Sequence, residues 1–318
     1  MMKRPLMLLV TSFFIACSPN KQIRDFVITE RNLIPEGTAF DKRTSTIYIS
    51  STFKRKIIQI RNNGSVEDFI LEKYEGIASV LGMEVDEKRG ILWVNACHAN
   101  EVLPLKDPET EREWTTSLYS FDLDSKKIIG KFDLQLDTAF LNDLTITPNG
   151  SVFATESVNG HLYFLNIEND SLELFLNLEE FDFLNGITYA EEYKALFVAS
   201  VQGIIRIDLE DKNYTLLETN ERIDAGGIDG LTFFDNKLIG HQSSKVSMFY
   251  LNEKGTEIVK SELIDTGDEF DSSTTGALGN GFYYFIVNSQ IRSGVDTIKK
   301  TIKPLDSLNN LIIRSIKL

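Results

Sequence analysis

A pattern of about 45 residues recurs six times in this chain, and it constrains the fold more than any other feature. Each copy opens with a polar residue beside Gly or Asp and continues through alternating apolar positions, a polar turn and a second apolar run. Two further apolar runs follow before the next copy begins. The residues that anchor the copies are Glu36, Met83 with its neighbour Glu84, Asn142, Asn185, Asp229 and Thr275. Their separations are 47, 59, 43, 44 and 46 residues, and self-similarity at such a period is typical of propellers and solenoids.

Four short apolar runs rich in Val, Ile, Phe and Tyr make up a copy of the repeat. In the first copy they lie within residues 36–41, 46–50, 56–60 and 66–70, with polar turns between them. Four strands per repeat make one blade of a propeller. No long segment carries a 3.6-residue apolar period. The sequence therefore predicts an all-β fold, a six-bladed β-propeller with four-stranded blades, as a single domain over residues 23–318.

Two irregularities of the repeat concern an insertion and the closure of the ring. The long second interval contains an acidic polar stretch at residues 100–114, which we interpret as an inserted loop. The last copy lacks a fourth apolar run, whereas the run at residues 23–28 precedes the first copy. We predict that this N-terminal strand completes the C-terminal blade, because such pairing removes the open edge of an incomplete ring.

The first 22 residues have the features of an export signal and a tether. Basic residues are followed by an apolar run at residues 6–16, which is too short to span a bilayer as a helix. Residues 14–17, Phe-Ile-Ala-Cys, resemble a lipobox in which Cys17 carries the lipid. We expect a signal peptide at 1–17, a tether at 18–22, and export to the bacterial cell envelope with membrane attachment through the lipid alone. An ordinary signal peptide with a coincidental cysteine is the alternative.

Charge and motif content exclude several classes of protein. The net charge of −14 and the absence of a Lys/Arg cluster exclude nucleic-acid binding, which needs a basic footprint. No serine-nucleophile elbow, zinc-protease helix motif or phosphate-binding glycine loop occurs. Cys97 has no partner once Cys17 is acylated, so we expect no disulfide. We expect a monomer.

The anchor residues are the candidate binding site. The first strand of each propeller blade lines the central channel, so anchors that are far apart in sequence converge there. Carboxylates and carboxamides form an oxygen-rich site that suits a hard cation, for which we expect Ca²⁺ first, with Mg²⁺ and Mn²⁺ as alternatives. Zn²⁺ more often takes His and Cys, but an oxygen-rich site accepts it with lower selectivity. The alternative is that Asn-Gly and Asp-Gly are ordinary turn dipeptides.

Four of these motifs also carry a family resemblance. Pro-Glu-Gly at Glu36, Leu-Asn-Asp at Asn142, Leu-Asn-Gly at Asn185 and Ile-Asp-Gly at Asp229 resemble the SMP-30/gluconolactonase (regucalcin-like) family. The paraoxonases and strictosidine synthase-like proteins are more distantly similar. The resemblance implies that Glu36, Asn185 and Asp229 bind a divalent metal, and that Asn142 holds metal-bound water or substrate. The substrate-binding arginine of the family has no match here, and Glu156 stands where that family commonly has Asp.

Other polar residues have two interpretations each. Glu84 and Asn288 are candidates for the channel wall or for a position behind the metal ligands. His98 and His241 follow strands in the second and fifth repeats. They are either proton carriers near the channel rim or polar caps of the strand ends. Asp143 is interpreted as structural.

Two functions follow from these features. The first is a metal-dependent hydrolase of a lactone or related ester, with Asp229 as general base and Asn142 orienting water or substrate. The second is a non-enzymatic propeller lipoprotein that binds a sugar, peptide or partner protein and uses the metal only for structure. The tether and the acidic insertion motivate the second function.

Overall fold

The computed structural model describes residues 22–98, 115–136, 138–296, 298–299 and 301–318. The predicted signal peptide, Cys17 and the insertion at 100–114 lie outside these ranges. Within them, no helix combines the length and the apolar character needed to cross a membrane.

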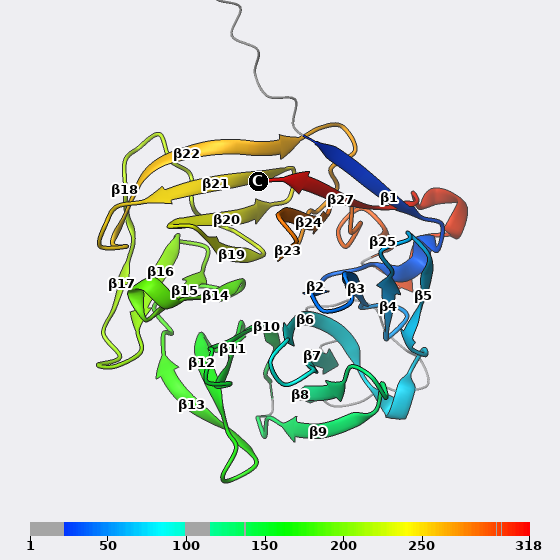
Figure 1. The fold of residues 1–318 in the computed structure, drawn as a ribbon, viewed down its shortest axis with the longest axis horizontal. Coiled ribbons are helices and arrows are strands. Elements are labelled where there is room, and N and C mark those ends of the chain that lie inside the picture. The colour runs from blue at the N-terminus through cyan, green and yellow to red at the C-terminus, as the bar shows by residue number, and fades with distance from the viewer. Residues whose placement is uncertain (1–21, 99–114, 137, 297, 300) are drawn as a thin grey trace, which may run out of the picture.

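Six sheets are arranged as blades around a central channel (Figure 1). Blade one contains β2 (Thr38–Asp41), β3 (Thr46–Ser51), β4 (Lys56–Ile60) and β5 (Val66–Ile70). Blade two contains β6 (Ser79–Asp86), β7 (Ile91–His98), β8 (Thr115–Asp122) and β9 (Ile128–Asp133). Blade three contains β10 (Leu141–Ile146), β11 (Val152–Glu156), β12 (His161–Asn166) and β13 (Ser171–Asn177). Neighbouring strands within each of these sheets are antiparallel and follow one another in sequence.

Blade four contains β14 (Ile187–Ala190), β15 (Ala195–Ala199), β16 (Ile204–Asp208) and β17 (Tyr214–Leu216). Blade five contains β19 (Leu231–Phe234), β20 (Lys237–Gln242), β21 (Lys245–Leu251) and β22 (Glu257–Thr266), and the short strand β18 (Glu218–Thr219) pairs with β22. Blade six contains β23 (Gly276–Gly279), β24 (Phe282–Ile286), β27 (Leu311–Lys317) and β1 (Ile23–Ile28). Short elements outside the blades are the hairpin β25 (Val295–Asp296) and β26 (Thr301–Ile302), and the 3₁₀ turns η1 (Arg31–Leu33), η2 (Tyr74–Gly76), η3 (Glu191–Tyr193) and η4 (Leu305–Ser307). The six-bladed propeller predicted from the repeat is confirmed.

The ring closes in the sixth blade, where β1 is the outermost strand. It pairs antiparallel with β27 over its whole length, from Ile23 opposite Ile316 to Ile28 opposite Leu311. Arg314 of β27 reinforces this pairing with two hydrogen bonds of 2.8 Å to the carboxylate of Asp25. Its Nη1 also donates to Asp265, near the end of β22, and to Glu269 in the connection that follows this strand, at 2.8 Å each. The guanidinium side chain is only 11% exposed, so this network is stronger than a surface ion pair.

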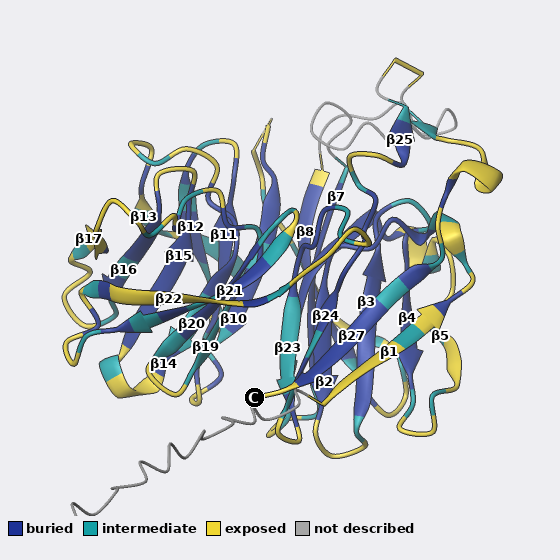
Figure 2. Cartoon of the chain, turned by 90° about the horizontal axis from the view of Figure 1, so that it is seen from above, coloured by how far each residue is buried: buried dark blue, intermediate teal, exposed yellow. Residues whose placement is uncertain are grey.

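The apolar core lies between the blades rather than at the centre of the ring. Six clusters of buried side chains each join two neighbouring blades, and the last of them joins blade six to blade one. Figure 2 shows the inner and middle strands as the buried part of the molecule. Because the faces of the blades supply the core, the inner edges of the innermost strands are free to carry polar groups into the channel.

Glycines allow the innermost strands to approach one another. A Cβ added to Gly37 would lie 2.1 Å from the carbonyl oxygen of Leu81, and one on Gly186 would lie 2.5 Å from the backbone nitrogen of Leu231. The glycines that follow the anchors at 36, 185 and 229 are absent from the residues with positive φ. These positions need glycine for close backbone approach, so the interpretation of Asn-Gly and Asp-Gly as turn dipeptides is wrong here.

Candidate functional site

One end of the channel, the Glu36 end, is ringed by one residue from each blade. The six residues line a single cavity of about 320 Å³: Glu36, Leu81, Asn142, Asn185, Asp229 and Thr274. The four motif residues chosen from the sequence are therefore brought together. In blade two a bulge between Val80 and Met83 places Leu81, not the predicted Met83, at the ring. In blade six the ring residue is Thr274, one position before the predicted anchor Thr275.

The carboxyl group of Glu36 is buried and incompletely paired. Its Oε2 has no hydrogen-bond partner among the described residues. Its backbone is held in place, because the hydroxyls of Thr274 and Thr275 donate to the carbonyl oxygen of Glu36 at 2.8 and 2.7 Å. A buried carboxyl oxygen without a partner costs free energy that a bound cation or proton would recover.

The hydrogen bonds of Asn142 and Asn185 within the protein are made by their amide nitrogens. Ser157 donates its single hydroxyl proton to the backbone oxygen of Leu184 at 2.5 Å, so it must accept from the Nδ2 of Asn142 at 3.0 Å. The Nδ2 of Asn185 donates to Oδ1 of Asp229 at 2.9 Å. Both amide nitrogens are thus used within the protein, which leaves both amide oxygens for the cavity.

Burial raises the pKa values of the acidic groups in the channel, and for some of them neighbouring carboxylates add to it. Burial raises the pKa of Glu36 well above its ordinary value, and the charges of Asp229 and Asp143 add to that effect. Burial raises the pKa of Asp229 to about 6, while its bond from Asn185 and the charge of Arg292 act in the opposite direction. A site that concentrates negative charge in this way attracts a cation.

The donor set fits a hard divalent cation. No three His, Cys, Asp or Glu side chains gather into a metal site anywhere in the part of the chain that the structure describes. The Glu36 end offers two carboxylates, and the amide oxygens of Asn142 and Asn185 would complete the set. All four donors are oxygens, which Ca²⁺ and Mg²⁺ prefer, and the unpaired Oε2 of Glu36 is the atom that most needs such a partner.

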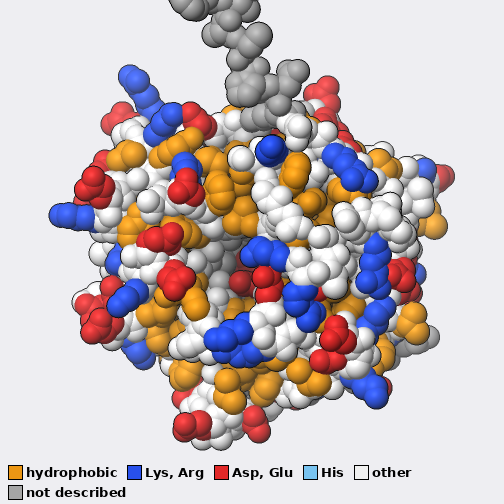
Figure 3. All heavy atoms as spheres, in the orientation of Figure 1, with side chains coloured by type: hydrophobic (Ala, Val, Ile, Leu, Met, Phe, Trp, Pro, Cys, Tyr) orange, Lys and Arg blue, Asp and Glu red, His pale blue; other side chains and the backbone are white. Residues whose placement is uncertain are grey.

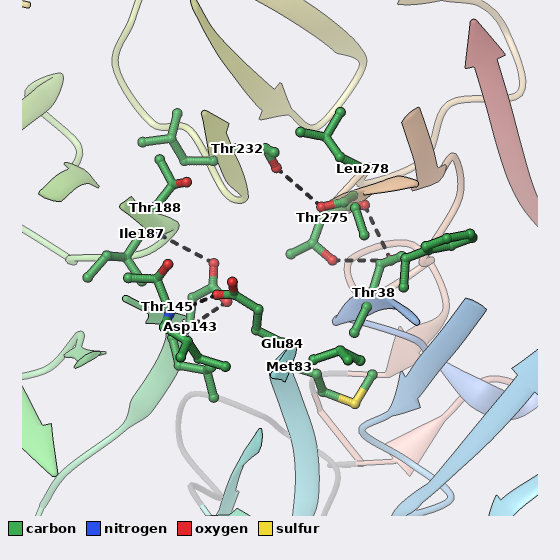
Figure 4. Close-up of a pocket in the computed structure, with 18 of the residues that line it drawn as sticks. Thr38, Met83, Glu84, Asp143, Thr145, Ile187, Thr188, Thr232, Thr275 and Leu278 are labelled. Atoms are coloured by element: carbon green, nitrogen blue, oxygen red, sulfur yellow. Dashed lines mark hydrogen bonds between the residues drawn. The ribbon is translucent and has the colours of Figure 1, made fainter. Parts of the chain in front are cut away.

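The opposite end of the channel, the Glu84 end, opens into a second cavity of about 260 Å³ (Figure 4). Here the side-chain oxygens bind the backbone of the next blade. Oε2 of Glu84 accepts from the backbone nitrogen of Ile146 at 3.1 Å. In the same way, the hydroxyl of Thr145 accepts from Tyr189 at 3.2 Å, and that of Thr188 accepts from Phe233 at 3.0 Å. Glu84 is therefore a channel-wall residue, as one of its two interpretations had it.

Asp143 follows Asn142 in sequence and lines the cavity at the Glu84 end (Figure 4). Its Oδ1 accepts from the backbone nitrogen of Leu144 at 2.9 Å, and its Oδ2 accepts from that of Ile187 at 3.3 Å. Burial raises the pKa of Asp143 to about 7, and the charge of Asp229 contributes in the same direction. Burial likewise raises the pKa of Glu84 to about 8, with a contribution from Asp143. The whole channel is thus acidic, and in Figure 3 the hollow at the centre of the ring is bordered by acidic and basic side chains.

His241 does not reach the Glu36-end cavity. It is fully buried between blades five and six, with Nδ1 2.9 Å from the Ser273 hydroxyl and Nε2 2.7 Å from the Tyr283 hydroxyl. Ser273 gives its proton to the backbone oxygen of Ile286 at 2.6 Å, so His241 donates from Nδ1 and accepts at Nε2. Burial lowers the pKa of His241 to about 3, and this neutral, enclosed ring argues against its predicted role as a proton carrier.

Asn288 and His98 also lie away from this cavity. Asn288 binds the backbone of its own blade: its Nδ2 donates to Asn310 at 2.8 Å and its Oδ1 accepts from Ile312 at 2.7 Å. Asn288 is therefore a structural residue, neither a channel-wall residue nor one that supports the metal ligands. His98 ends β7, half-buried, and is not among the described residues that line the Glu36-end cavity.

Among the lining residues that were not selected from the sequence, three are aromatic or charged. Phe140 and Phe183 stand just before the innermost strands of blades three and four, and Arg292 comes from the connection between β24 and β25. Phe140 and Phe183 lie two residues before the anchors Asn142 and Asn185, and this position in the repeat could have identified them from the sequence. Arg292 lies outside the repeated pattern, so only the folded structure identifies it.

Comparisons with known proteins agree on the fold. No family model and no curated protein matches the chain. Among solved structures, a gluconolactonase from Xanthomonas campestris has a TM-score of 0.64 at 11% identity, covering 94% of this chain and 90% of that chain. A luciferin-regenerating enzyme has a TM-score of 0.61 at 16% identity, covering 93% and 96%. Virginiamycin B lyase from Staphylococcus aureus has a TM-score of 0.58 at 12% identity, covering 94% and 100%. The chain therefore shares the propeller fold of these enzymes.

Proposed function

We propose that this protein is a metal-dependent hydrolase of a lactone or related ester, held at the bacterial cell envelope by a lipid on Cys17. The observation that carries the proposal is the ring at the Glu36 end. It combines an unpaired buried carboxyl oxygen with two amide oxygens that the hydrogen bonds leave available, at the floor of a cavity large enough for a small ester. Gluconolactonases and a luciferin-regenerating enzyme among the proteins of similar fold support an enzymatic role.

Each residue of the ring has a role in this proposal. Glu36, Asn185 and Asp229 would hold the cation, with Ca²⁺ preferred because every donor is an oxygen. The bound cation would supply a Lewis acid for the substrate carbonyl. Asn142, fixed by its bond to Ser157, orients the attacking water or the substrate through its amide oxygen. Asp229, with a pKa of about 6, is ionised at neutral pH and accepts the proton of the attacking water through a carboxylate oxygen.

A substrate panel with a matched pair of variants tests the proposal. Lactones and aryl esters are assayed with Ca²⁺, Mg²⁺, Mn²⁺ and Zn²⁺, and metal affinity is measured by calorimetry. We expect D229N to lower kcat/KM at least about 100-fold, as expected for loss of a general base, whereas D124N at an exposed turn leaves it unchanged. Undiminished turnover in D229N would contradict the proposal. Tight metal binding without turnover of any substrate would instead favour the non-enzymatic binding propeller.

A further inference from the structure

The cavity at the Glu36 end has a polar floor and an apolar wall. Six side chains form that wall: Leu81, Phe140, Phe183, Val201, Ile228 and Ile291. Leu81, Cys97 and Phe140, with Ile291 packed against them, form a small cluster separate from the six clusters between the blades. Phe183 is 41% exposed and Val201 is 54% exposed. Apolar surface left open inside a cavity gains free energy when an apolar ligand covers it.

The aromatic part of the wall is held in place by the fold. Glu156, a departure from the family pattern, accepts the backbone N–H of Phe140 at 2.9 Å and so fixes the segment that carries this ring. Phe183 has a φ of 52°, a left-handed conformation that a non-glycine residue rarely adopts. The neighbouring backbone is fixed by a hydrogen bond of 2.9 Å from the Val201 N–H to the carbonyl oxygen of Asp182. The rings of Phe140 and Phe183 lie 6.5 Å apart, so they form one aromatic surface.

Arg292 is the single basic residue among the described residues that line this cavity. The loop that carries it is fixed, because Gln290 exchanges hydrogen bonds with Asn309 and its backbone oxygen accepts from Gly294 at 2.7 Å. Arg292 itself is exposed, and within the described ranges no hydrogen bond or ion pair fixes its guanidinium group, although its charge acts on the nearby Asp229. A guanidinium group presented from a rigid loop without a fixed partner suits a carboxylate of a ligand.

We infer that the cavity selects an ester or lactone with an apolar body and one negative charge. The carbonyl lies over the Glu36 floor, the apolar body covers Phe140 and Phe183, and the anionic group meets Arg292. This inference rests on the proposed function and narrows its substrate class. A divalent cation offsets the two floor carboxylates, which leaves the charge of Arg292 uncompensated and favours a monoanion. A sugar lactone carries several hydroxyl groups, and those that face the wall of Phe, Leu, Ile and Val side chains would find no hydrogen-bond partner there.

A pair of esters that differ in charge tests this assignment. The probes are 4-carboxyphenyl butanoate, an anion, and 4-carbamoylphenyl butanoate, its neutral counterpart of similar size. We expect R292Q to raise KM for the anionic ester about tenfold, as for loss of one charge-assisted contact, and to change KM for the neutral ester less than about twofold. F183A should raise KM for both esters alike. Equal effects of R292Q on the two esters would overturn the role of Arg292.

Binding of a non-hydrolysable anion separates this inference from the proposed function. Calorimetry with N-(4-carboxyphenyl)butanamide and its carbamoyl counterpart reports ligand selection without turnover. Preference for the anion that R292Q abolishes supports the inference even when no ester is hydrolysed, an outcome that would count against the hydrolase. Equal affinity for both amides in the wild-type protein overturns it even when esters are hydrolysed. Unchanged melting temperatures of R292Q and F183A serve as the control for folding.

Discussion

The two ends of the channel are built from the same six innermost strands and the residues that lead into them, yet they use their acidic groups in different ways. At the Glu84 end, the carboxylate and threonine oxygens accept backbone N–H groups from the neighbouring blade. At the Glu36 end, Oε2 of Glu36 has no partner in the described structure, and the amide groups of Asn142 and Asn185 use their nitrogens within the protein. One end uses its oxygens to join blades, and the other leaves them for a ligand.

This difference shows that a buried carboxyl group with a raised pKa does not by itself identify a binding site. Glu84 and Asp143 have strongly raised pKa values, as Glu36 does, because all three lie in the same poorly solvated channel. Glu84 and Asp143 nevertheless accept hydrogen bonds from backbone nitrogens. The decisive property is the balance of donors and acceptors around each oxygen, which separates structural carboxyl groups from candidate ligands.

The largest expected effect is on metal affinity, which should depend on the Glu36 end of the channel and not on the Glu84 end. We expect E36Q to weaken Ca²⁺ binding at least about 100-fold, because the variant loses a negative charge from a partly desolvated donor set. E84Q makes the same change at the other end and keeps an acceptor for Ile146, so its affinity should stay within about twofold of the wild type. Calorimetric titration with Ca²⁺ measures both variants. Equal losses in E36Q and E84Q would contradict the distinction between the two ends.

The repeat allowed much of the fold to be predicted, because the blades share one chemistry. Alternating apolar positions and regular anchors gave the number of blades and the convergence of Glu36, Asn142, Asn185 and Asp229. The run at residues 23–28 was assigned to the last blade because that blade lacked a strand, and β1 does pair with β27. Such features depend on local pattern and on the need to pair strand edges, which the sequence expresses directly.

The parts that could not be predicted depend on geometry without a local pattern. The bulge in β6 shifts the ring residue from Met83 to Leu81, and a bulge leaves little trace in the sequence. His241 and Asn288 were placed near the channel from their positions after strands, but burial and their hydrogen-bond partners give them structural roles. Arg292 reaches the cavity from an irregular connection, so nothing in the repeat points to it.

An intermediate effect should appear in the stability of the metal-free protein as a function of pH. The pKa of Glu84 is raised to about 8 from an ordinary value of 4.5. Below pH 4.5 the group is neutral in both states and makes no difference. Between pH 4.5 and 8 the Glu84 carboxyl is ionised in the unfolded chain but stays protonated in the folded protein. The wild type therefore loses stability as the pH rises through this range, and the loss is complete above pH 8.

E84Q removes this pH-dependent loss while keeping a side-chain oxygen for Ile146. We expect E84Q to be more stable than the wild type by an amount on the order of 5 kcal/mol at pH 9, and to match it at pH 4. Urea denaturation at a series of pH values measures the difference, and E168Q at an exposed turn is the control for charge removal. A difference between E84Q and the wild type that did not change with pH would show that Glu84 is not desolvated in the folded protein.

The smallest expected effect concerns the threonines that join the blades at the Glu84 end. T188V preserves shape but removes the acceptor of the Phe233 N–H, which is 3.0 Å from the hydroxyl oxygen. Loss of one such bond should lower the free energy of unfolding by about 1 kcal/mol, as measured by urea denaturation. T145V removes the acceptor of the Tyr189 N–H and also the hydroxyl that bonds the Glu84 carboxyl, so its loss should be larger than that of T188V.

N142L completes the comparison from the other end. The Asn142 amide donates to Ser157, but its oxygen is available to the cavity, so N142L should weaken ligand binding more than T188V does. Ca²⁺ affinity in T188V should stay within about twofold of the wild type, because a neutral hydroxyl at the opposite end of the channel contributes little to the field at Glu36. A tenfold loss of Ca²⁺ affinity in T188V would mean that the contacts between blades set the width of the ring at Glu36. The two ends would then be mechanically coupled, and the oxygens that join the blades would also be part of the binding site.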